Sequence, residues 1–116
     1  MTRSFCSMID LQEYIRLHYQ EELSVPKLAE QFGYNSNYLS TVYKRATGES
    51  LIHYINQTRI AAAKALLLDT KDSITTIASR VGYSDSKYFI RIFRQMTGMT
   101  PAMFRNVYFR KYINLE

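Results

Sequence analysis

One segment of this chain occurs twice, and this repeat constrains the fold more than any other feature. The first copy, GYNSNYLSTVY, runs from Gly33 to Tyr43, and the second, GYSDSKYFIRIF, runs from Gly82 to Phe93. An alanine precedes each glycine by four residues, and a Thr-Gly pair follows each copy: Ala29 and Thr47-Gly48, then Ala78 and Thr97-Gly98. The copies are offset by 49 residues up to the glycine and by 50 beyond it, so the second turn is one residue longer.

Each copy predicts a short helix, a glycine turn and a second helix with a polar outer face, which is the helix-turn-helix layout. Glycine permits the left-handed backbone conformation that such a tight turn requires. Ser24 and Ser73 are the expected N-caps of helices 25–32 and 74–81, and Pro26 is tolerated in a first turn. The second helices are expected from Ser36 to Thr47 and from Asp85 or Ser86 to Thr97. The residues expected to be buried are Val25, Leu28, Ala29, Phe32, Leu39, Val42, Tyr43, Phe89, Ile92 and Phe93.

Three further helices flank and connect these units. Apolar side chains at helical spacing predict helices at 8–19 (Met8, Ile9, Leu11, Ile15, Tyr19) and 50–68 (Ile52, Ile55, Ile60, Ala63, Leu66, Leu67). The longer one, which Ser50 caps, would measure roughly 27 Å. A final helix opens at Thr100-Pro101 and contains Met103, Phe104 and Val107. We therefore expect an all-α fold of about seven helices. It has helix-turn-helix subdomains at 8–49 and 73–109, a linker helix at 50–69 and a C-terminal tail at 110–116.

The charge distribution favours a polyanionic partner. The chain has 116 residues and a net charge of +5, and residues 1–72 hold eight basic and eight acidic side chains. Residues 73–116 hold seven basic side chains against Asp85 and Glu116, so the whole excess lies at one end.

The other bulk features predict a soluble cytoplasmic protein. The apolar run Ile60 to Leu68 is too short to span a bilayer, and the N-terminus lacks a signal peptide. The single cysteine, Cys6, excludes an intrachain disulfide and a cysteine-based zinc site. His18 and His53 have no ligand partner at metal spacing, so no metal or other cofactor is expected. The abrupt start suggests a fragment of a longer chain.

The second unit and the long helix also match a known pattern. The matching residues are Arg59, Ile60, Ala63, Leu66-Leu67, Ile77, Ala78, Gly82, Tyr83, Asp85, Tyr88, Phe89, Arg91, Phe93, Arg94, Gly98, Pro101, Phe104 and Arg105. On these residues the sequence resembles the DNA-binding domain of the AraC/XylS family of bacterial transcription regulators, over about residues 8–109. The resemblance implies two recognition helices that enter major grooves on one DNA face, about 34 Å apart. It also implies a separate effector-binding or dimerisation domain, of which this sequence has no trace.

In the second recognition helix, Arg91 is the best candidate base reader, because its guanidinium can bind guanine through two hydrogen bonds. The alternative is a phosphate contact or a salt bridge with Asp85, although Asp85 itself suits a helix cap. Lys87 is equally suited to a base and to a phosphate. Arg94 is a candidate phosphate contact, and Tyr88 matches a family position at the edge of the interface, with packing as its alternative.

In the first recognition helix, the candidate base readers are short. Asn37 suits an adenine edge, whereas Ser40 and Thr41 are permissive, and simple solvation is an equal alternative for all three. Lys44 and Arg45 are candidate phosphate contacts. We expect Arg59 and Arg105, by contrast, to tie helices together, and Lys64 to lie on a solvated face.

Three function classes remain. The leading one is a sequence-specific domain that binds double-stranded DNA. The alternative is a helical interaction module that contacts RNA polymerase or a sensor partner, which the near-neutral residues 1–72 would suit. An enzyme is the weakest reading, because no nucleophile set, carboxylate pair or phosphate loop is evident.

Overall fold

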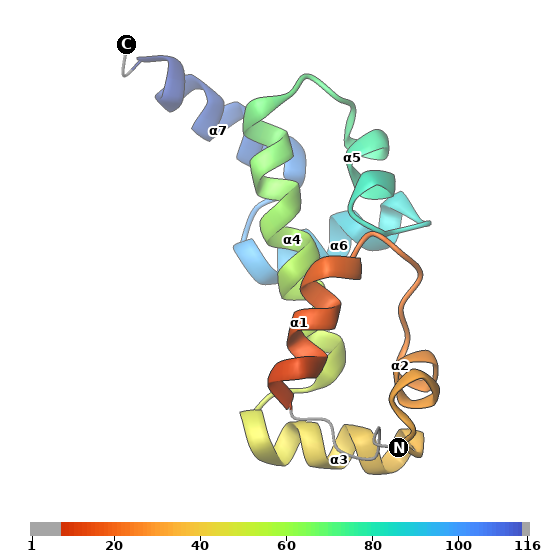
Figure 1. The fold of residues 1–116 in the computed structure, drawn as a ribbon. Coiled ribbons are helices and arrows are strands. Elements are labelled where there is room, and N and C mark those ends of the chain that lie inside the picture. The colour runs from red at the N-terminus through yellow and green to blue at the C-terminus, as the bar shows by residue number, and fades with distance from the viewer. Residues whose placement is uncertain (1–7, 115–116) are drawn as a thin grey trace. The chain divides into compact units, whose positions relative to one another are not determined.

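The computed structural model describes residues 8–114 of the chain, and this part folds into seven helices (Figure 1). These are α1 (Met8–His18), α2 (Val25–Phe32), α3 (Ser36–Thr47), α4 (Leu51–Asp69), α5 (Ile74–Arg80), α6 (Ser86–Thr97) and α7 (Pro101–Asn114). The chain divides into two compact units between Thr58 and Arg59, within α4. The all-α prediction with two helix-turn-helix units is confirmed. The predicted domain boundaries stay predictions, and α7 continues as helix to Asn114.

Most helices begin at a side chain that caps free backbone N–H groups. Ser24 Oγ accepts from the Lys27 N–H at 3.2 Å, and Ser73 Oγ accepts from the Thr76 N–H at 3.0 Å, as predicted. Asp85 accepts from the Lys87 N–H at 2.9 Å, so its carboxylate is a helix cap. Further caps follow the same chemistry: Asn35 at α3, Ser50 at α4 and Thr100 before α7. These bonds satisfy donors that have no partner inside the helix.

The glycine turns have the predicted left-handed backbone. Gly33 has φ 80° and Gly82 has φ 107°, and in both units the next residue closes the turn. The N–H of Tyr34 donates to Ala29 O at 2.7 Å, and the N–H of Tyr83 donates to Ala78 O at 2.9 Å. The alanines are therefore part of each turn as well as buried between helices.

Replacing Gly33 with alanine is expected to lower the free energy of unfolding by about 1 kcal/mol. An added Cβ would have no heavy atom within 4 Å, so the cost comes from the positive φ and not from crowding. Asparagine tolerates this conformation, so Gly33→Asn should cost less than Gly33→Ala. Urea denaturation measures both, and equal losses for the two variants would contradict this explanation.

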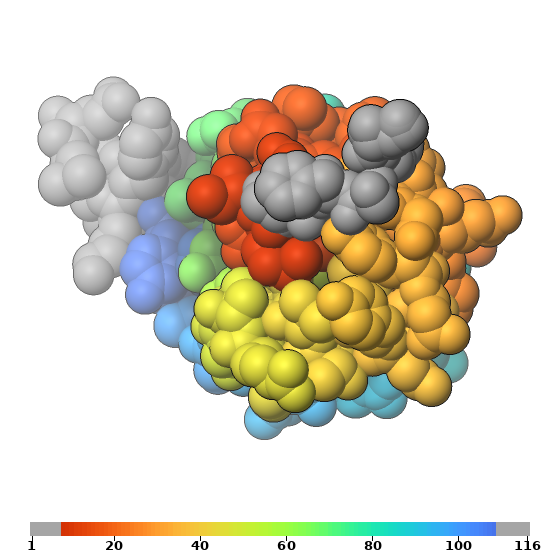
Figure 2. All heavy atoms as spheres, turned by 60° about the horizontal axis from the view of Figure 1, so that its bottom comes forward, coloured from red at the N-terminus to blue at the C-terminus, as the bar shows by residue number. Residues whose placement is uncertain are grey.

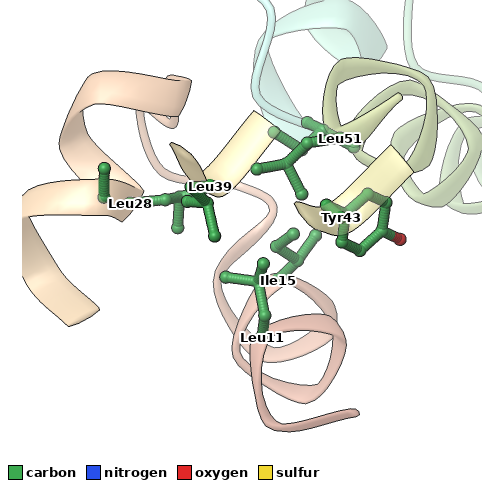
Figure 3. Close-up of a cluster of buried hydrophobic side chains, with 8 residues drawn as sticks. Leu11, Ile15, Leu28, Leu39, Tyr43 and Leu51 are labelled. Atoms are coloured by element: carbon green, nitrogen blue, oxygen red, sulfur yellow. The ribbon is translucent and has the colours of Figure 1, made fainter. Parts of the chain in front are cut away.

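The first unit has its own apolar core, drawn in Figure 3. In Figure 1, α3 runs crosswise below α1 and α2. Each of the four helices contributes two residues to this core: Leu11, Ile15, Leu28, Ala29, Leu39, Tyr43, Leu51 and Ile55. The core thus holds α3, the first candidate recognition helix, against α1, α2 and the start of α4.

Two apolar residues lie outside the stripes that the sequence predicted for them. Ile9 is 73% exposed and Ile52 is 45% exposed. The buried stripe of α1 contains Leu11 and Ile15, and that of α4 starts at Leu51. Because successive residues of an α-helix are rotated by about 100°, Ile9 and Ile52 point away from these stripes. The prediction that they face the core is therefore wrong.

The second unit is built around aromatic side chains. Phe89 and Phe93 of α6 are fully buried, and their ring centroids lie 5.8 Å apart. Phe93 also contacts Phe104 of α7 at 5.5 Å, with the rings nearly perpendicular. Edge-to-face contacts of this kind stabilise a core beyond simple area burial. The α4 residues Ile60, Ala63 and Leu67 and the α5 residues Ile77 and Ala78 are buried as well.

Candidate nucleic-acid interface

The packing of α6 turns its basic residues to the surface. Phe89, Ile92 and Phe93 are buried, which leaves the opposite side of the helix to the exposed Lys87, Arg91 and Arg94. The predicted division between an apolar inner face and a basic outer face is therefore present. Nothing in α6 is acidic.

Arg91 contacts an aromatic ring rather than a carboxylate. Its guanidinium carbon lies 5.1 Å from the centroid of the Tyr88 ring. Within the described part of the chain, no ion pair joins Arg91 to Asp85, whose carboxylate accepts the Lys87 N–H. Tyr88 is partly buried and also contacts Tyr83, with ring centroids 5.8 Å apart.

The outer face of α3 is polar and less charged. The sequence candidates on it are all exposed: Asn37, Ser40, Thr41, Lys44 and Arg45. Figure 2 shows α3 at the molecular surface, in yellow and orange along the lower part of the view. Only the last turn of α3 carries charge, and α3 contains no acidic residue.

Within residues 8–114, no carboxylate forms an ion pair with the lysines and arginines of α3 and α6. The ion pairs in the described residues involve Arg16, His18, His53 and Arg80, none of which belongs to α3 or α6. All the lysines and arginines of α3 and α6 are therefore free of a carboxylate partner within residues 8–114. An exposed cation without a partner is free to neutralise an external anion.

Tyr38 was missed by the sequence reasoning. It lies on α3, is 57% exposed, and its ring is 5.7 Å from that of Tyr34. The repeat contains the signal, because an offset of 50 residues pairs Tyr38 with Tyr88. Tyr38 therefore belongs to the same surface as Asn37 and Thr41.

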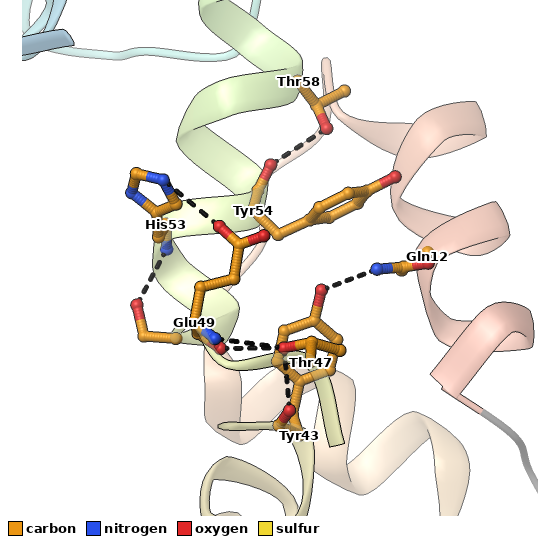
Figure 4. Close-up of polar contacts among 8 residues, drawn as sticks. Gln12, Tyr43, Thr47, Glu49, His53, Tyr54 and Thr58 are labelled. Atoms are coloured by element: carbon orange, nitrogen blue, oxygen red, sulfur yellow. Dashed lines mark hydrogen bonds and ion pairs between the residues drawn. The ribbon is translucent and has the colours of Figure 1, made fainter. Parts of the chain in front are cut away.

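The repeated threonines fix the ends of both candidate recognition helices. The hydroxyl of Thr47 lies 2.9 Å from Tyr43 O and accepts from the Glu49 N–H at 3.3 Å (Figure 4). Thr97 makes the equivalent contacts with Phe93 O at 2.8 Å and the Met99 N–H at 3.1 Å. The Thr-Gly pair thus ties each helix end to the segment that follows.

Tyr43 carries a polar group into the first core. Its phenol accepts a hydrogen bond from Gln12 Nε2 at 3.0 Å, also shown in Figure 4. Burial is the main reason that the pKa of Tyr43 is raised above its ordinary value. The hydroxyl therefore stays protonated at neutral pH and joins α3 to α1.

The arginines expected to tie helices together do so. Arg105 of α7 donates to Leu67 O at 2.9 Å and to Thr70 O at 3.0 Å, at the end of α4. Arg59 is 7% exposed and lies 5.1 Å from the centroid of the Tyr83 ring. Burial lowers the pKa of Arg59 and raises that of Tyr83. Lys64 is exposed, as expected, with its ammonium 6.0 Å from the Phe104 ring centroid.

None of the residues that the structure describes form a group of three or more His, Cys, Asp or Glu side chains placed to hold a metal ion. His18 and His53 instead lie beside Glu21 and Glu49, at 2.8 and 3.2 Å. Cys6 lies outside the described residues. Within the same part of the chain, every helix is too short or too polar to cross a bilayer.

Comparison with known proteins identifies relatives across most of the chain. The profile of a family described as a helix-turn-helix domain matches residues 28–106. An uncharacterized HTH-type transcriptional regulator of Staphylococcus aureus is 38% identical over 93 residues, or 80% of this chain and 12% of that protein. The bifunctional transcriptional activator/DNA repair enzyme AdaA of Bacillus subtilis is 36% identical over 97 residues, or 84% of this chain and 46% of AdaA. The chain thus spans less than half the length of these relatives.

Solved structures share the fold. The C-terminal domain of AraT, a response regulator from Geobacillus stearothermophilus, matches with a TM-score of 0.79 and 34% identity, over 83% of this chain and 80% of that one. A probable AraC family transcriptional regulator from Rhodopseudomonas palustris matches with a TM-score of 0.73 and 26% identity, over 83% of this chain and 91% of that one. The DNA-binding domain of AdpA, solved with a target DNA, has a TM-score of 0.84 over 92% of this chain and 96% of that one. Because the two sequences are only 20% identical, this match shows the fold alone.

Proposed function

Because the chain belongs to the AraC family of helix-turn-helix transcription regulators, we propose that it binds double-stranded DNA sequence-specifically through α3 and α6. The observation that carries this proposal is the charge on these helices. Their outer faces present lysines and arginines that have no carboxylate partner within residues 8–114, and neither helix contains an acidic residue. Such a face suits the phosphates of a DNA groove.

In this proposal each recognition helix enters a major groove and divides its contacts between bases and phosphates. Arg91 and Lys87 read bases from α6, and Asn37, Ser40 and Thr41 read bases from α3. Arg94, Lys44, Arg45 and Tyr88 contact the phosphate backbone, which orients the protein without specifying sequence. The length of α4, Leu51–Asp69, suits a spacer between neighbouring grooves.

The two helices are proposed to contribute unequally. In the aligned repeat, Lys87, Arg91 and Arg94 stand where the first copy has Asn37, Thr41 and Lys44. The second unit therefore supplies more of the charge-dependent affinity, whereas the first reads through short side chains.

The proposal is tested by selecting bound duplexes from a random library and measuring their affinity at several salt concentrations. We expect one enriched site with two half-sites about one DNA turn apart, and a steep loss of affinity as salt rises. A library without an enriched sequence, or binding that is insensitive to salt, would refute it. In the second case the helical interaction module becomes the better hypothesis.

Replacing Arg94 with glutamine is expected to weaken binding to all duplexes by a similar factor. Because one phosphate contact is lost, the slope of log affinity against log salt should become shallower by about 0.9. Arg80→Gln is the matched control, since Arg80 already has a partner in Asp72 at 2.6 Å. A loss of affinity confined to particular base pairs would instead assign Arg94 to base reading.

The proposal also covers the role of the chain in the whole protein. We propose that the chain acts by binding rather than by catalysis, as the regulator portion of a longer cytoplasmic protein. RNA polymerase and an effector-binding or dimerisation domain of the same protein are its proposed partners. Turnover of a nucleic-acid substrate by this chain would contradict that assignment.

A further inference from the structure

We infer that Tyr88 is a positioning residue that holds the guanidinium of Arg91 ready for base reading. The inference deepens the proposed function of α6 and rests on it. Tyr88 and Arg91 form the outer end of a row of contacting aromatic and cationic side chains whose inner end is Arg59. The row begins on α4 and ends on the exposed face of α6.

Each side chain of this row contacts the next. The guanidinium carbon of Arg59 lies 5.1 Å from the Tyr83 ring centroid, and the Tyr83 and Tyr88 centroids lie 5.8 Å apart at 59°. The guanidinium carbon of Arg91 then lies 5.1 Å from the Tyr88 centroid. Arg59 and Tyr83 are 7% and 5% exposed, so packing fixes the inner half.

This arrangement matters because an arginine on a helix surface has many rotamers. Most of that freedom is lost when the guanidinium binds a base edge, and this loss opposes binding. A cation over the face of an aromatic ring is attracted to it, so the Tyr88 ring restricts Arg91 before DNA arrives. Tyr83 in turn limits the movement of the Tyr88 ring.

The first unit contains a similar pair of tyrosine rings, with a different residue at the position of the arginine. Tyr34 and Tyr38 have ring centroids 5.7 Å apart, close to the separation in the second unit. Thr41 stands at the position that corresponds to Arg91, so Tyr38 has no arginine to hold. The repeat therefore supplies a matched control for the role of the tyrosine.

The test compares Tyr88→Leu with Tyr88→Phe on the selected site and on duplexes that change the base pair read by Arg91. Tyr88→Leu removes the ring and should reduce the preference at that base pair about two- to fivefold. Tyr88→Phe keeps the ring and should retain the preference. Tyr38→Leu should leave the preference at that base pair unchanged. In a protein that already carries Arg91→Ala, adding Tyr88→Leu should cause no further loss of this preference.

A second measurement needs no DNA. NMR relaxation of the Arg91 Nε–H group in the free protein should show faster, wider motion in Tyr88→Leu than in the wild type and in Tyr88→Phe. Thermal melting confirms that each variant is folded.

Two results would overturn the inference. One is unchanged Arg91 motion in Tyr88→Leu. The other is an equal loss of affinity for every duplex in both Tyr88 variants, which would leave Tyr88 only a phosphate contact through its hydroxyl. A wild-type protein without base preference refutes the proposed function instead, and the NMR measurement still decides the role of Tyr88.

Discussion

Replacing Arg91 with alanine is expected to remove most of the preference at one base pair, at a cost in discrimination of about 1–3 kcal/mol. The reason is the position of Arg91 on α6. It is exposed, has no carboxylate partner within the described residues, and lies over the Tyr88 ring. A guanidinium in this state can form two parallel hydrogen bonds with guanine, which no other base pair reproduces. Quantitative binding to duplexes that differ at single positions measures the effect.

Arg91→Lys separates base reading from simple charge. Lysine keeps the positive charge but lacks the planar fork, so this variant should retain the salt dependence while losing much of the guanine preference. Arg94→Ala is the second comparison, because it should lower affinity without changing which sequence is preferred. If Arg91→Ala only weakens all duplexes equally, Arg91 is a phosphate contact and the base reader of α6 must be Lys87.

The repeat was sufficient to predict the turns and the caps because these depend on single residue types. The positive φ of Gly33 and the hydrogen bond that the Lys87 N–H donates to the Asp85 carboxylate are local features, set by a few neighbouring residues. The Thr-Gly pairs are local features of the same kind, because the hydroxyls of Thr47 and Thr97 make equivalent contacts at the ends of α3 and α6. Local chemistry of this kind can be read from sequence.

Contacts between distant residues could not be predicted in this way. Arg105 was expected to join helices, but its acceptors, Leu67 O and Thr70 O, are backbone atoms that sequence patterns do not identify. The Arg91–Tyr88 contact was not predicted, since spacing along a helix does not identify the ring of Tyr88 as the partner of Arg91. The prediction that Ile9 faces the core was wrong, because helical spacing defines an apolar stripe along a helix but does not show which side of that stripe the core covers.

Replacing Phe93 with alanine is expected to have the largest effect on stability, lowering the free energy of unfolding by about 3–5 kcal/mol. Phe93 is fully buried and contacts Phe89 at 5.8 Å and Phe104 at 5.5 Å, so its loss removes the ring that joins α6 to α7. Because a domain of this size is stable by only about 5–15 kcal/mol, much of its stability would disappear. Met103→Ala, at a residue that is 52% exposed on α7, is the control and should change stability by less than about 0.5 kcal/mol.

Urea denaturation measures these losses, and amide hydrogen exchange locates them. Exchange should accelerate more in α5 and α6 than in α2 and α3, because the core of the first unit contains Tyr43 at the corresponding position and is left intact. Binding of Phe93→Ala to DNA should fall even though no proposed contact residue has changed, since α6 can present Arg91 only while its apolar face is packed. A Phe93→Ala protein with near wild-type stability would show that the aromatic contacts do not hold the second recognition helix in place.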